Sequence, residues 1–414
     1  MKILIKDVII KRPIVSINNK QNKITGIASI LIEDASILEV YEEGQNVDIE
    51  CDKIINGNKR VHAFVDLMDM HVHFRTPGQE YKEDMVTGTK AAAKGGFTHV
   101  VCMANTKPVV DNADTLKMLN SIIAEQAIVN VYPVGGITKD LNGIQMADID
   151  EMAKGKIIAL SDDGFGLNNE EFLFKAYLKG AEYGLPILLH CQIGDMDAYD
   201  RNSEIKAIET SLRILKKVAD ARVHIQHVST KESIDLVHEA QKNGFKVTME
   251  TCPHYITLTH ADIEKYKGNA IMNPPLREQG DKEYSIEMLK QNVINVLVTD
   301  HAPHSTEEKT GDKIMNGIIG LESSIPVTLS VIDDNEKMVE ILLNQMSKNP
   351  CCIVGVPYNV GNANITLIGL EDKYKLDINK FESKARNCPY DNWTVKGRVI
   401  ATICKGKVVY EYKD

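Results

Sequence analysis

The 414-residue sequence predicts an α/β protein: a closed (β/α)8 TIM-type barrel joined to a small β domain built from both chain termini. Eight apolar, strand-like runs recur through the central part of the chain, and helix-like segments fill most of the gaps between them. Metal-binding residue types follow five of the eight runs. Because no glycine-rich dinucleotide loop follows the first run, a closed barrel is favoured over an open doubly wound sheet. We expect the small β domain to comprise residues 1–55 and 349–414, and the barrel residues 56–348.

The overall composition argues against several classes of protein. The formal net charge is −10 with no long run of one sign, which argues against binding to nucleic acid or to a membrane surface. No apolar stretch approaches the length of a bilayer span, and the first residues lack a secretory h-region. The eight cysteines show no Cys-x-x-Cys spacing, so we expect reduced thiols in a cytoplasmic protein.

The two ends of the chain carry β-strand patterns. Apolar-biased runs cover residues 3–10, 28–32 and 36–41 near the start, and residues 397–403 and 407–410 near the end. Lys405 and Gly406 separate the last two runs, and a two-residue turn between alternating runs predicts a hairpin. Neither end is long enough to bury a core alone, so we expect the two to pair.

The eight central runs alternate with helix-like segments. The first run, 63–68, reads as one buried strand leading to Asp69. Apolar runs end near residues 70, 103, 132, 160, 189, 226, 249 and 298, with helix-like segments at 83–94, 115–125, 169–183, 203–219 and 231–242. Gly184 and Gly244 fall where helices are expected to stop, just before the next strand.

Polar residues at the strand ends predict a metal site. His71 and His73 are two apart on an extended strand and therefore project from the same face. Taken alone, this pair is also compatible with two surface histidines. However, Asp162–Asp163, His190, His227 and Asp300 follow later strands, and active sites of barrel enzymes form at these carboxyl-terminal strand ends.

The donor set suits two Zn²⁺-like ions, since imidazole and carboxylate ligands favour such metals. His71, His73 and Asp300 would hold one ion, His190 and His227 the other, and either Asp162 or Asp163 would bridge them. Asp300 is the candidate for moving a proton, and Arg75 and Asn105 for binding a substrate carboxylate. His99, His224 and His238 are interpreted as core residues, whereas His254 and His301 remain open.

Several motifs together resemble class I dihydroorotases of the amidohydrolase superfamily. They are Asp69–Arg75 with Pro77–Gly78, Gly88–Gly96, Asn105–Pro108, Ser161–Gly164, His190–Cys191, His227–Ser233, Met272–Arg277, Thr299–His304, Gly320–Glu322 and Asn387–Tyr390. The resemblance implies reversible cyclisation of N-carbamoyl-L-aspartate to L-dihydroorotate in pyrimidine biosynthesis.

The resemblance also implies the roles of individual residues. It implies two Zn²⁺ ions held by His71, His73, Asp163, His190, His227 and Asp300, with Asp163 as the bridge. It implies substrate contacts by Arg75, Asn105, Asn273 and His304. We further expect a homodimer and an association with aspartate carbamoyltransferase.

Two alternative functions are weighed against this one. Hydantoinases, dihydropyrimidinases and many allantoinases resemble the chain, but they carry a carboxylated lysine at the strand end that here reads Ala159–Asp163, with Lys156 at the strand's start. An inactive dihydroorotase-like scaffold subunit should have lost metal ligands, yet every ligand position is filled. Residues 305–316 are the candidate lid.

Overall fold

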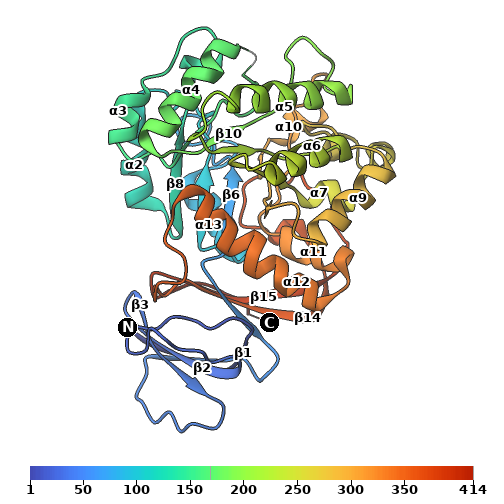
Figure 1. Ribbon diagram of the computed structural model, residues 1–414. Coiled ribbons are helices and arrows are strands. Elements are labelled where there is room, and N and C mark those ends of the chain that lie inside the picture. Colours follow the sequence, from blue (N-terminus) through green and yellow to red (C-terminus); the bar gives the residue numbers. More distant parts are fainter. Residues whose placement is uncertain (168, 414) are drawn as a thin grey trace.

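The computed structural model describes residues 1–167 and 169–413, and these residues form two sheets. Figure 1 shows a barrel surrounded by helices, with a second sheet below it that contains both chain termini. The predicted fold class, a (β/α)8 barrel with a β domain built from the two ends, is confirmed.

The barrel strands follow one another in chain order, and each pairs in parallel with the next. They are β6 (Met68–Val72), β7 (His99–Cys102), β8 (Asn130–Gly135), β9 (Ala159–Leu160), β10 (Ile187–Leu189), β11 (Val223–Ile225), β12 (Val247–Thr251) and β13 (Val296–Leu297). The ring closes where the His73 backbone N–H donates to the His301 carbonyl at 2.9 Å. All carboxyl-terminal strand ends therefore meet on one rim.

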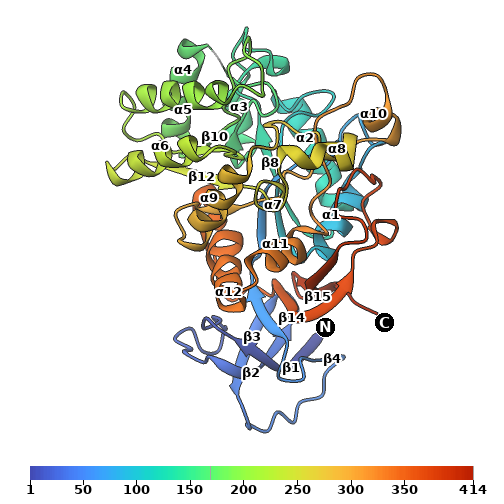
Figure 2. The ribbon, with the colours of Figure 1, turned by 90° about the vertical axis from the view of Figure 1, so that its right-hand side faces the viewer.

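Helices cover the outside of the barrel (Figure 2). They are α1 (Met85–Lys94), α2 (Ala113–Gln126), α3 (Ile149–Lys154), α4 (Glu170–Tyr183), α5 (Arg201–Leu215), α6 (Lys231–Lys242), α7 (Pro253–Thr257), α8 (Ile263–Tyr266), α9 (Gln279–Lys290), α10 (Thr306–Thr310), α11 (Ser324–Ile332), α12 (Asn335–Leu343) and α13 (Asn349–Val354). Short turns lie at η1 (Lys139–Leu141), η2 (His260–Asp262), η3 (Lys267–Ala270), η4 (Asn344–Lys348) and η5 (Ile378–Lys380). As the sequence predicts, α4 stops at Gly184, whose φ of +67° is the left-handed conformation that glycine adopts without strain.

Alternate residues of the barrel strands pack into different apolar clusters. In β7, Val100 and Cys102 pack with the helices, whereas Val101 packs with Met68 of β6 and Leu188 of β10. This two-residue alternation is expected of strands buried on both faces, and it fixes which side chains face the barrel interior.

The second sheet is mostly antiparallel and runs β16-β15-β14-β5-β1-β2-β3, with β4 beside β1. Its strands are β1 (Lys2–Ile10), β2 (Gly26–Glu33), β3 (Ser36–Glu42), β4 (Lys53–Asn56), β5 (His62–Val65), β14 (Ile365–Lys375), β15 (Thr394–Cys404) and β16 (Lys407–Glu411). The sequence did not predict β14, which joins the N-terminal strands to the C-terminal hairpin. The boundaries at residues 55 and 348 stay predictions.

The expectation of one strand over residues 63–68 is wrong. The chain turns at Asp66, whose φ is +51°, so β5 pairs with β14 in the terminal sheet while β6 begins the barrel. The buried Asp66 carboxylate accepts hydrogen bonds from the Asn359 backbone N–H at 2.8 Å and from Asn364 Nδ2 at 3.1 Å. These partners are nearly 300 residues away, so the local apolar pattern could not reveal the turn.

Across residues 1–167 and 169–413, no helix combines the length and the apolar character needed to cross a membrane.

Candidate metal centre

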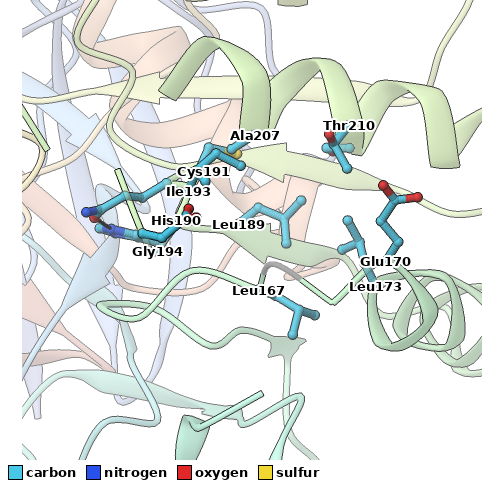
Figure 3. A pocket seen from close by; sticks show the side chains of 13 residues that line it. Leu167, Glu170, Leu173, Leu189, His190, Cys191, Ile193, Gly194, Ala207 and Thr210 are labelled. Atoms are coloured by element: carbon cyan, nitrogen blue, oxygen red, sulfur yellow. Dashed lines mark hydrogen bonds between the residues drawn. The ribbon is translucent and has the colours of Figure 1, made fainter. Parts of the chain in front are cut away.

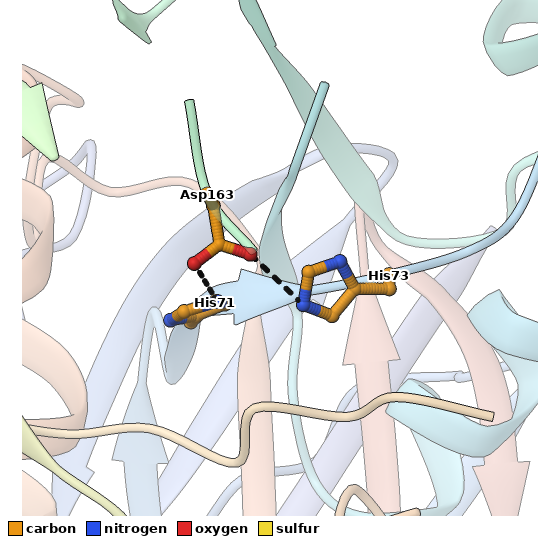
Figure 4. Close-up of side chains that lie close together, drawn as sticks. All are labelled: His71, His73 and Asp163. Atoms are coloured by element: carbon orange, nitrogen blue, oxygen red, sulfur yellow. Dashed lines mark ion pairs between the residues drawn. The ribbon is translucent and has the colours of Figure 1, made fainter. Parts of the chain in front are cut away.

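Five side chains that follow or end four of the barrel strands meet on the rim at the carboxyl ends of these strands. His71 and His73 come from β6 and the segment just after it, and Asp163, His190 and His227 follow β9, β10 and β11. Two groups, His71–His73–Asp163 and Asp163–His190–His227, each place their potential ligand atoms within 4.8 Å of one another. Figure 4 shows the Asp163 carboxylate directed at both imidazoles of the first group.

The Asp163 carboxylate lies at the centre of this cluster. Its Oδ1 is 3.4 Å from His71 Nε2, 3.5 Å from His227 Nε2 and 3.6 Å from His190 Nδ1, and its Oδ2 is 3.4 Å from His73 Nε2. Among the described residues, no hydrogen-bond donor satisfies the buried Oδ1. A buried carboxylate oxygen without a donor, facing three imidazole nitrogens, fits a site for divalent cations.

Neighbouring polar groups orient the imidazoles. His71 Nδ1 lies 2.6 Å from Glu250 Oε1, and His73 Nδ1 lies 2.8 Å from Asn105 Oδ1, so the Nε2 atom of each ring faces Asp163. His190 is turned the other way: its Nε2 lies 3.1 Å from Gln192 Oε1, which leaves Nδ1 for the centre. Such outer contacts fix the tautomer and the ring orientation of metal-binding histidines.

Asp300 approaches the cluster from β13. Its Oδ1 is 3.1 Å from His73 Nε2 and 3.5 Å from His71 Nε2. Asp300, His227 and Arg75 all have positive φ values, of 49°, 34° and 59°. For residues with a side chain this conformation is uncommon and costs free energy, and such strain concentrates at functional sites.

Mutual electrostatic stabilisation keeps the cluster charged. Burial opposes ionisation of Asp163, but the neighbouring imidazoles outweigh it and hold the pKa of Asp163 well below its usual value. Burial likewise opposes a charge on His71, while Asp163, Glu250 and Asp300 raise its pKa well above the usual value. The ionised Asp163 therefore presents a negative charge to the imidazole nitrogens at the centre of the cluster.

The two consecutive aspartates point to different partners. Asp162 accepts hydrogen bonds from the Ile137 backbone N–H at 2.7 Å and the Thr138 backbone N–H at 3.0 Å, so it holds the loop after β8. Asp163 faces the histidines. Of the two aspartates, Asp163 therefore lies toward the candidate ligands, whereas the oxygens of Asp162 accept hydrogen bonds from the loop after β8.

A cleft of about 400 Å³ opens above the cluster. All the predicted site residues line it except His71, which lies fully buried beneath Asp163. On one wall, Arg75 Nη2 is 3.4 Å from His304 Nε2, and Arg75 Nε donates to the Pro303 carbonyl at 3.2 Å. Burial, reinforced by Arg75 and Lys82, lowers the pKa of His304 to about 3, so this ring is neutral at pH 7.

Two further predicted substrate contacts, Asn105 and Asn273, also touch the histidines. Asn105 lies against His73, as described above, and Asn273 Nδ2 is 2.6 Å from Gln192 Oε1 and 3.2 Å from His190 Nε2. Both amides thus lie between the histidine cluster and the open cleft.

Sequence reasoning missed Glu250. This carboxylate of β12 is fully buried and contacts His71 Nδ1 through Oε1 and, at 2.9 Å through Oε2, His224 Nε2. His224, interpreted from the sequence as a core residue, is indeed buried, but it supports the residue that orients His71. A charged residue inside an otherwise apolar strand was the available signal.

The segment predicted as a lid, residues 305–316, contains α10 and then residues 313–316, which together with Gly317 line the cleft. Lys309 is buried beneath this segment and donates to the carbonyls of Ile271 at 3.0 Å, Met315 at 2.7 Å and Gly317 at 2.8 Å. The ammonium group therefore fastens the cleft wall to the loop that leads to Asn273.

A second pocket of about 430 Å³ lies outside the barrel wall beside His190 (Figure 3). Leu167, Leu173, Leu189 and Ile193 give it a largely apolar lining. Neither of the two candidate ligand groups lies in it, so the chemistry belongs to the first cleft.

Solved structures share this architecture. An L-hydantoinase (dihydropyrimidinase) from Arthrobacter aurescens superposes with a TM-score of 0.86 at 22% sequence identity, covering 100% of this chain and 96% of its own. A dihydropyrimidinase from Brevibacillus agri NCHU1002 has a TM-score of 0.83 at 20% identity, covering 99% and 95%. At this level of identity the likeness shows the fold, a barrel with a terminal sheet, and the candidate metal centre lies on the carboxyl-terminal rim of that barrel.

Sequence comparison identifies the family. Residues 62–213 match the family model described as "Dihydro-orotase-like". A dihydroorotase from Syntrophotalea carbinolica is 36% identical over 408 residues, covering 93% of this chain and 95% of the relative. One from Acetivibrio thermocellus is 34% identical over 415 residues, covering 94% and 96%. The chain belongs to the dihydroorotase family.

Proposed function

We propose that the protein is a class I dihydroorotase that interconverts N-carbamoyl-L-aspartate and L-dihydroorotate. The sequence relatives support this substrate, since dihydroorotases match over more than 90% of the chain. The observation that carries the proposal is the Asp163-centred histidine cluster at the base of a cleft whose wall presents Arg75.

In this proposal two Zn²⁺ ions bind at the cluster. His71, His73 and Asp300 would hold one ion, His190 and His227 the other, with Asp163 between them. When bound, such a pair lowers the pKa of water and polarises a carbonyl group. The undonated Oδ1 of Asp163 and the inward-facing imidazole nitrogens support this assignment.

Asp300 is the proposed acid–base residue. Burial opposes its ionisation, but His71 and His73 hold the pKa of Asp300 below its usual value, so Asp300 is an ionised carboxylate at neutral pH. In the hydrolytic direction, Asp300 takes the proton of the attacking water and delivers it to the departing ring nitrogen. Cyclisation is the reverse. Its place on the cleft wall supports this role because a proton shuttle must reach both atoms.

Arg75 is the proposed binder of the substrate carboxylate, assisted by His304, Asn105 and Asn273. A guanidinium pairs with a carboxylate through two parallel N–H bonds, and burial strengthens this contact. Arg75 is 8% exposed and its side chain lines the cleft, which supports the assignment. The neutral His304 ring beside it adds no second positive charge, and its Nε2 lies 2.8 Å from the Asn316 carbonyl oxygen.

The two alternatives are less well supported. The hydantoinase-type alternative rests on likeness of fold at about one-fifth identity. Asp163 follows β9, where the resemblance to hydantoinases would require a lysine, and Lys156 is exposed before the strand. An inactive scaffold has no need of a complete ligand cluster. The homodimer, the association with aspartate carbamoyltransferase and the cytoplasmic location stay predictions.

The decisive experiment measures hydrolysis of dihydroorotate by the purified protein together with its metal content. We expect activity with about two zinc ions per chain. Side-by-side assays on hydantoin, dihydrouracil and allantoin should show much lower rates. Metal without dihydroorotate hydrolysis would favour a hydantoinase-type activity, and absence of both would favour the scaffold.

A further inference from the structure

Another polar cavity, separate from the catalytic cleft, lies at the junction of the barrel and the terminal sheet. It has a volume of about 490 Å³ and shares no lining residue with the catalytic cleft. Its walls come from the end of α1, the start of α11, the loop after β14 and the face of β15 and β16.

The central feature of this cavity is Arg398 of β15. Its guanidinium carbon lies 3.9 Å from the ring centroid of Tyr374 and 4.3 Å from that of Tyr412. Tyr374 belongs to β14, and Tyr412 follows β16, so the two rings flank the arginine from the neighbouring strands. Stacking holds the planar group in place and leaves its N–H edge for an acceptor.

Among the described residues, Arg398 has no acceptor of its own. Within residues 1–167 and 169–413, no carboxylate forms an ion pair with it and no oxygen accepts a hydrogen bond from it. Arginines in comparable half-buried positions usually pair with carboxylates or carbonyls. A fixed guanidinium facing a cavity without an acceptor is suited to an anion that comes from solution.

The carboxylates around the cavity already have partners. Glu322 accepts hydrogen bonds from the Glu382 backbone N–H at 2.8 Å and the Ser383 backbone N–H at 3.2 Å, and lies 3.2 Å from Lys94 Nζ. Glu411 pairs with Lys53 at 2.5 Å. Asp377 lies 3.8 Å from Lys380 Nζ. Lys375 and Lys413 add positive charge to the lining, so the cations outnumber the carboxylates.

The cavity also provides aromatic surface. Besides the two stacked tyrosines, Phe381 and Tyr410 line it. Aromatic rings beside a guanidinium bind flat rings by stacking while the cation pairs with a negative group. Both elements lie within one cavity large enough for a small ligand.

We propose that this junction cavity binds a small flat anion, a ring that carries a carboxylate or phosphate group, with the negative group paired to Arg398. The ring packs against the aromatic residues between the barrel and the terminal sheet. The site is separate from the catalytic cleft, so its occupancy does not depend on the proposed reaction.

The test uses isothermal titration calorimetry on the full-length, metal-loaded protein with phenyl phosphate and benzoate as probes. Inorganic phosphate supplies the charge without the ring, and benzyl alcohol the ring without the charge. We expect one or both complete probes to bind at least several-fold more tightly than either half-probe. The tighter of the two identifies the preferred negative group.

Variants locate the binding. Arg398→Gln should weaken binding about tenfold or more, because it removes a charged hydrogen-bonding partner. Tyr412→Leu, which removes one stacking ring near the chain end, should weaken it several-fold and serves if Arg398→Gln folds poorly. Arg213→Gln, at an exposed arginine paired with Glu170 at 2.6 Å, is the matched control and should bind like the wild type.

Arg75→Ala separates this cavity from the catalytic cleft. Binding that survives Arg75→Ala and is lost in Arg398→Gln supports the junction site. Binding lost in Arg75→Ala but retained in Arg398→Gln would overturn the proposal. So would the absence of binding to the wild type, or inorganic phosphate binding as tightly as phenyl phosphate.

Discussion

The two large sheets of the protein differ in whether their strands bring candidate functional residues together. In the barrel, every strand points the same way, so residues that follow different strands converge on one rim; His71, Asp163, His190 and His227 meet there. In the terminal sheet, neighbouring strands mostly run in opposite directions, and its strand ends are divided between two edges. Parallel topology, rather than the number of strands, concentrates the chemistry.

The junction cavity qualifies this contrast. The terminal sheet can still assemble a polar site, but it does so on the face of adjacent strands, where Tyr374, Arg398 and Tyr412 lie side by side. At the barrel rim, residues that follow different strands come together, whereas on the face of the terminal sheet, side chains of adjacent strands lie next to one another. Variants in the two regions should show which residues affect activity or metal binding and which affect stability alone.

The largest effect is expected at the centre of the rim. Asp163→Asn should reduce dihydroorotate hydrolysis to background and lower the bound zinc, because the carboxylate faces four imidazoles. Asp162→Asn is the matched control: it should lower stability by about 1–3 kcal/mol through its loop contacts but retain metal. Metal analysis and a kinetic assay of both variants measure the difference. Equal zinc content in both would contradict the central role of Asp163.

Asp300→Ala should lower turnover by about 10²–10⁴-fold while most of the metal stays bound. The reason is that the other ligand positions remain intact when the proton shuttle is removed. Turnover and zinc content of the same preparation provide the measurement. Wild-type turnover in this variant would rule out the proton-transfer role.

A smaller effect is expected behind the ligands. Glu250→Gln should reduce metal affinity or activity about 10–100-fold, because it weakens the contact that orients His71. Asp281→Asn, at a buried carboxylate that pairs with Arg201 at 2.8 Å, should affect stability alone. Competition with a zinc chelator compares the two variants, and equal zinc affinities would show that Glu250 does not support the centre.

Lys309→Met should raise KM several-fold with a smaller change in kcat. It leaves three buried carbonyl groups without their donor and loosens residues 313–317 of the cleft wall, at a cost of about 1–3 kcal/mol or more in stability. Lys282→Met, at a lysine that donates to the Thr257 carbonyl alone at 2.9 Å, is the control. Steady-state kinetics should separate them, and an unchanged KM for Lys309→Met would exclude the fastening role.

The smallest effect concerns the junction of the two regions. Burial raises the pKa of Glu322 to about 7, above that of an unfolded glutamate, so the folded protein binds more protons than the unfolded chain between about pH 4.3 and 7. The contribution of Glu322 to stability therefore falls as pH rises through this window. Melting curves should show the wild type losing stability relative to Glu322→Gln between pH 5 and 8, by on the order of 1–3 kcal/mol. A constant difference would contradict the shifted pKa.

Much of the rim could be predicted because its signals are local. A histidine pair two residues apart, and carboxylates or histidines directly after apolar runs, identify strand ends without knowledge of packing. Residues supplied from inside other strands were missed: Glu250 belongs to β12, yet it acts on His71 of β6. The supporting role of His224 was missed for the same reason.

In the terminal regions, too, local patterns predict some strands, whereas other features depend on contacts between distant residues. The hairpin at Lys405–Gly406 and the first three strands have local patterns, and the structure contains them. The strand β14 and the turn at Asp66 depend on pairing between residues hundreds of positions apart.

The sequence by itself determined the barrel, the strand patterns at both termini and the strand ends that carry the candidate ligands, because strand and helix periodicity is encoded over short windows. Tertiary structure alone decided which aspartate faces the histidines, which carboxylate orients His71 and where Arg398 finds its aromatic neighbours. Those outcomes depend on contacts between side chains far apart in the chain. Their distances and burial are fixed only once the two sheets have closed and packed.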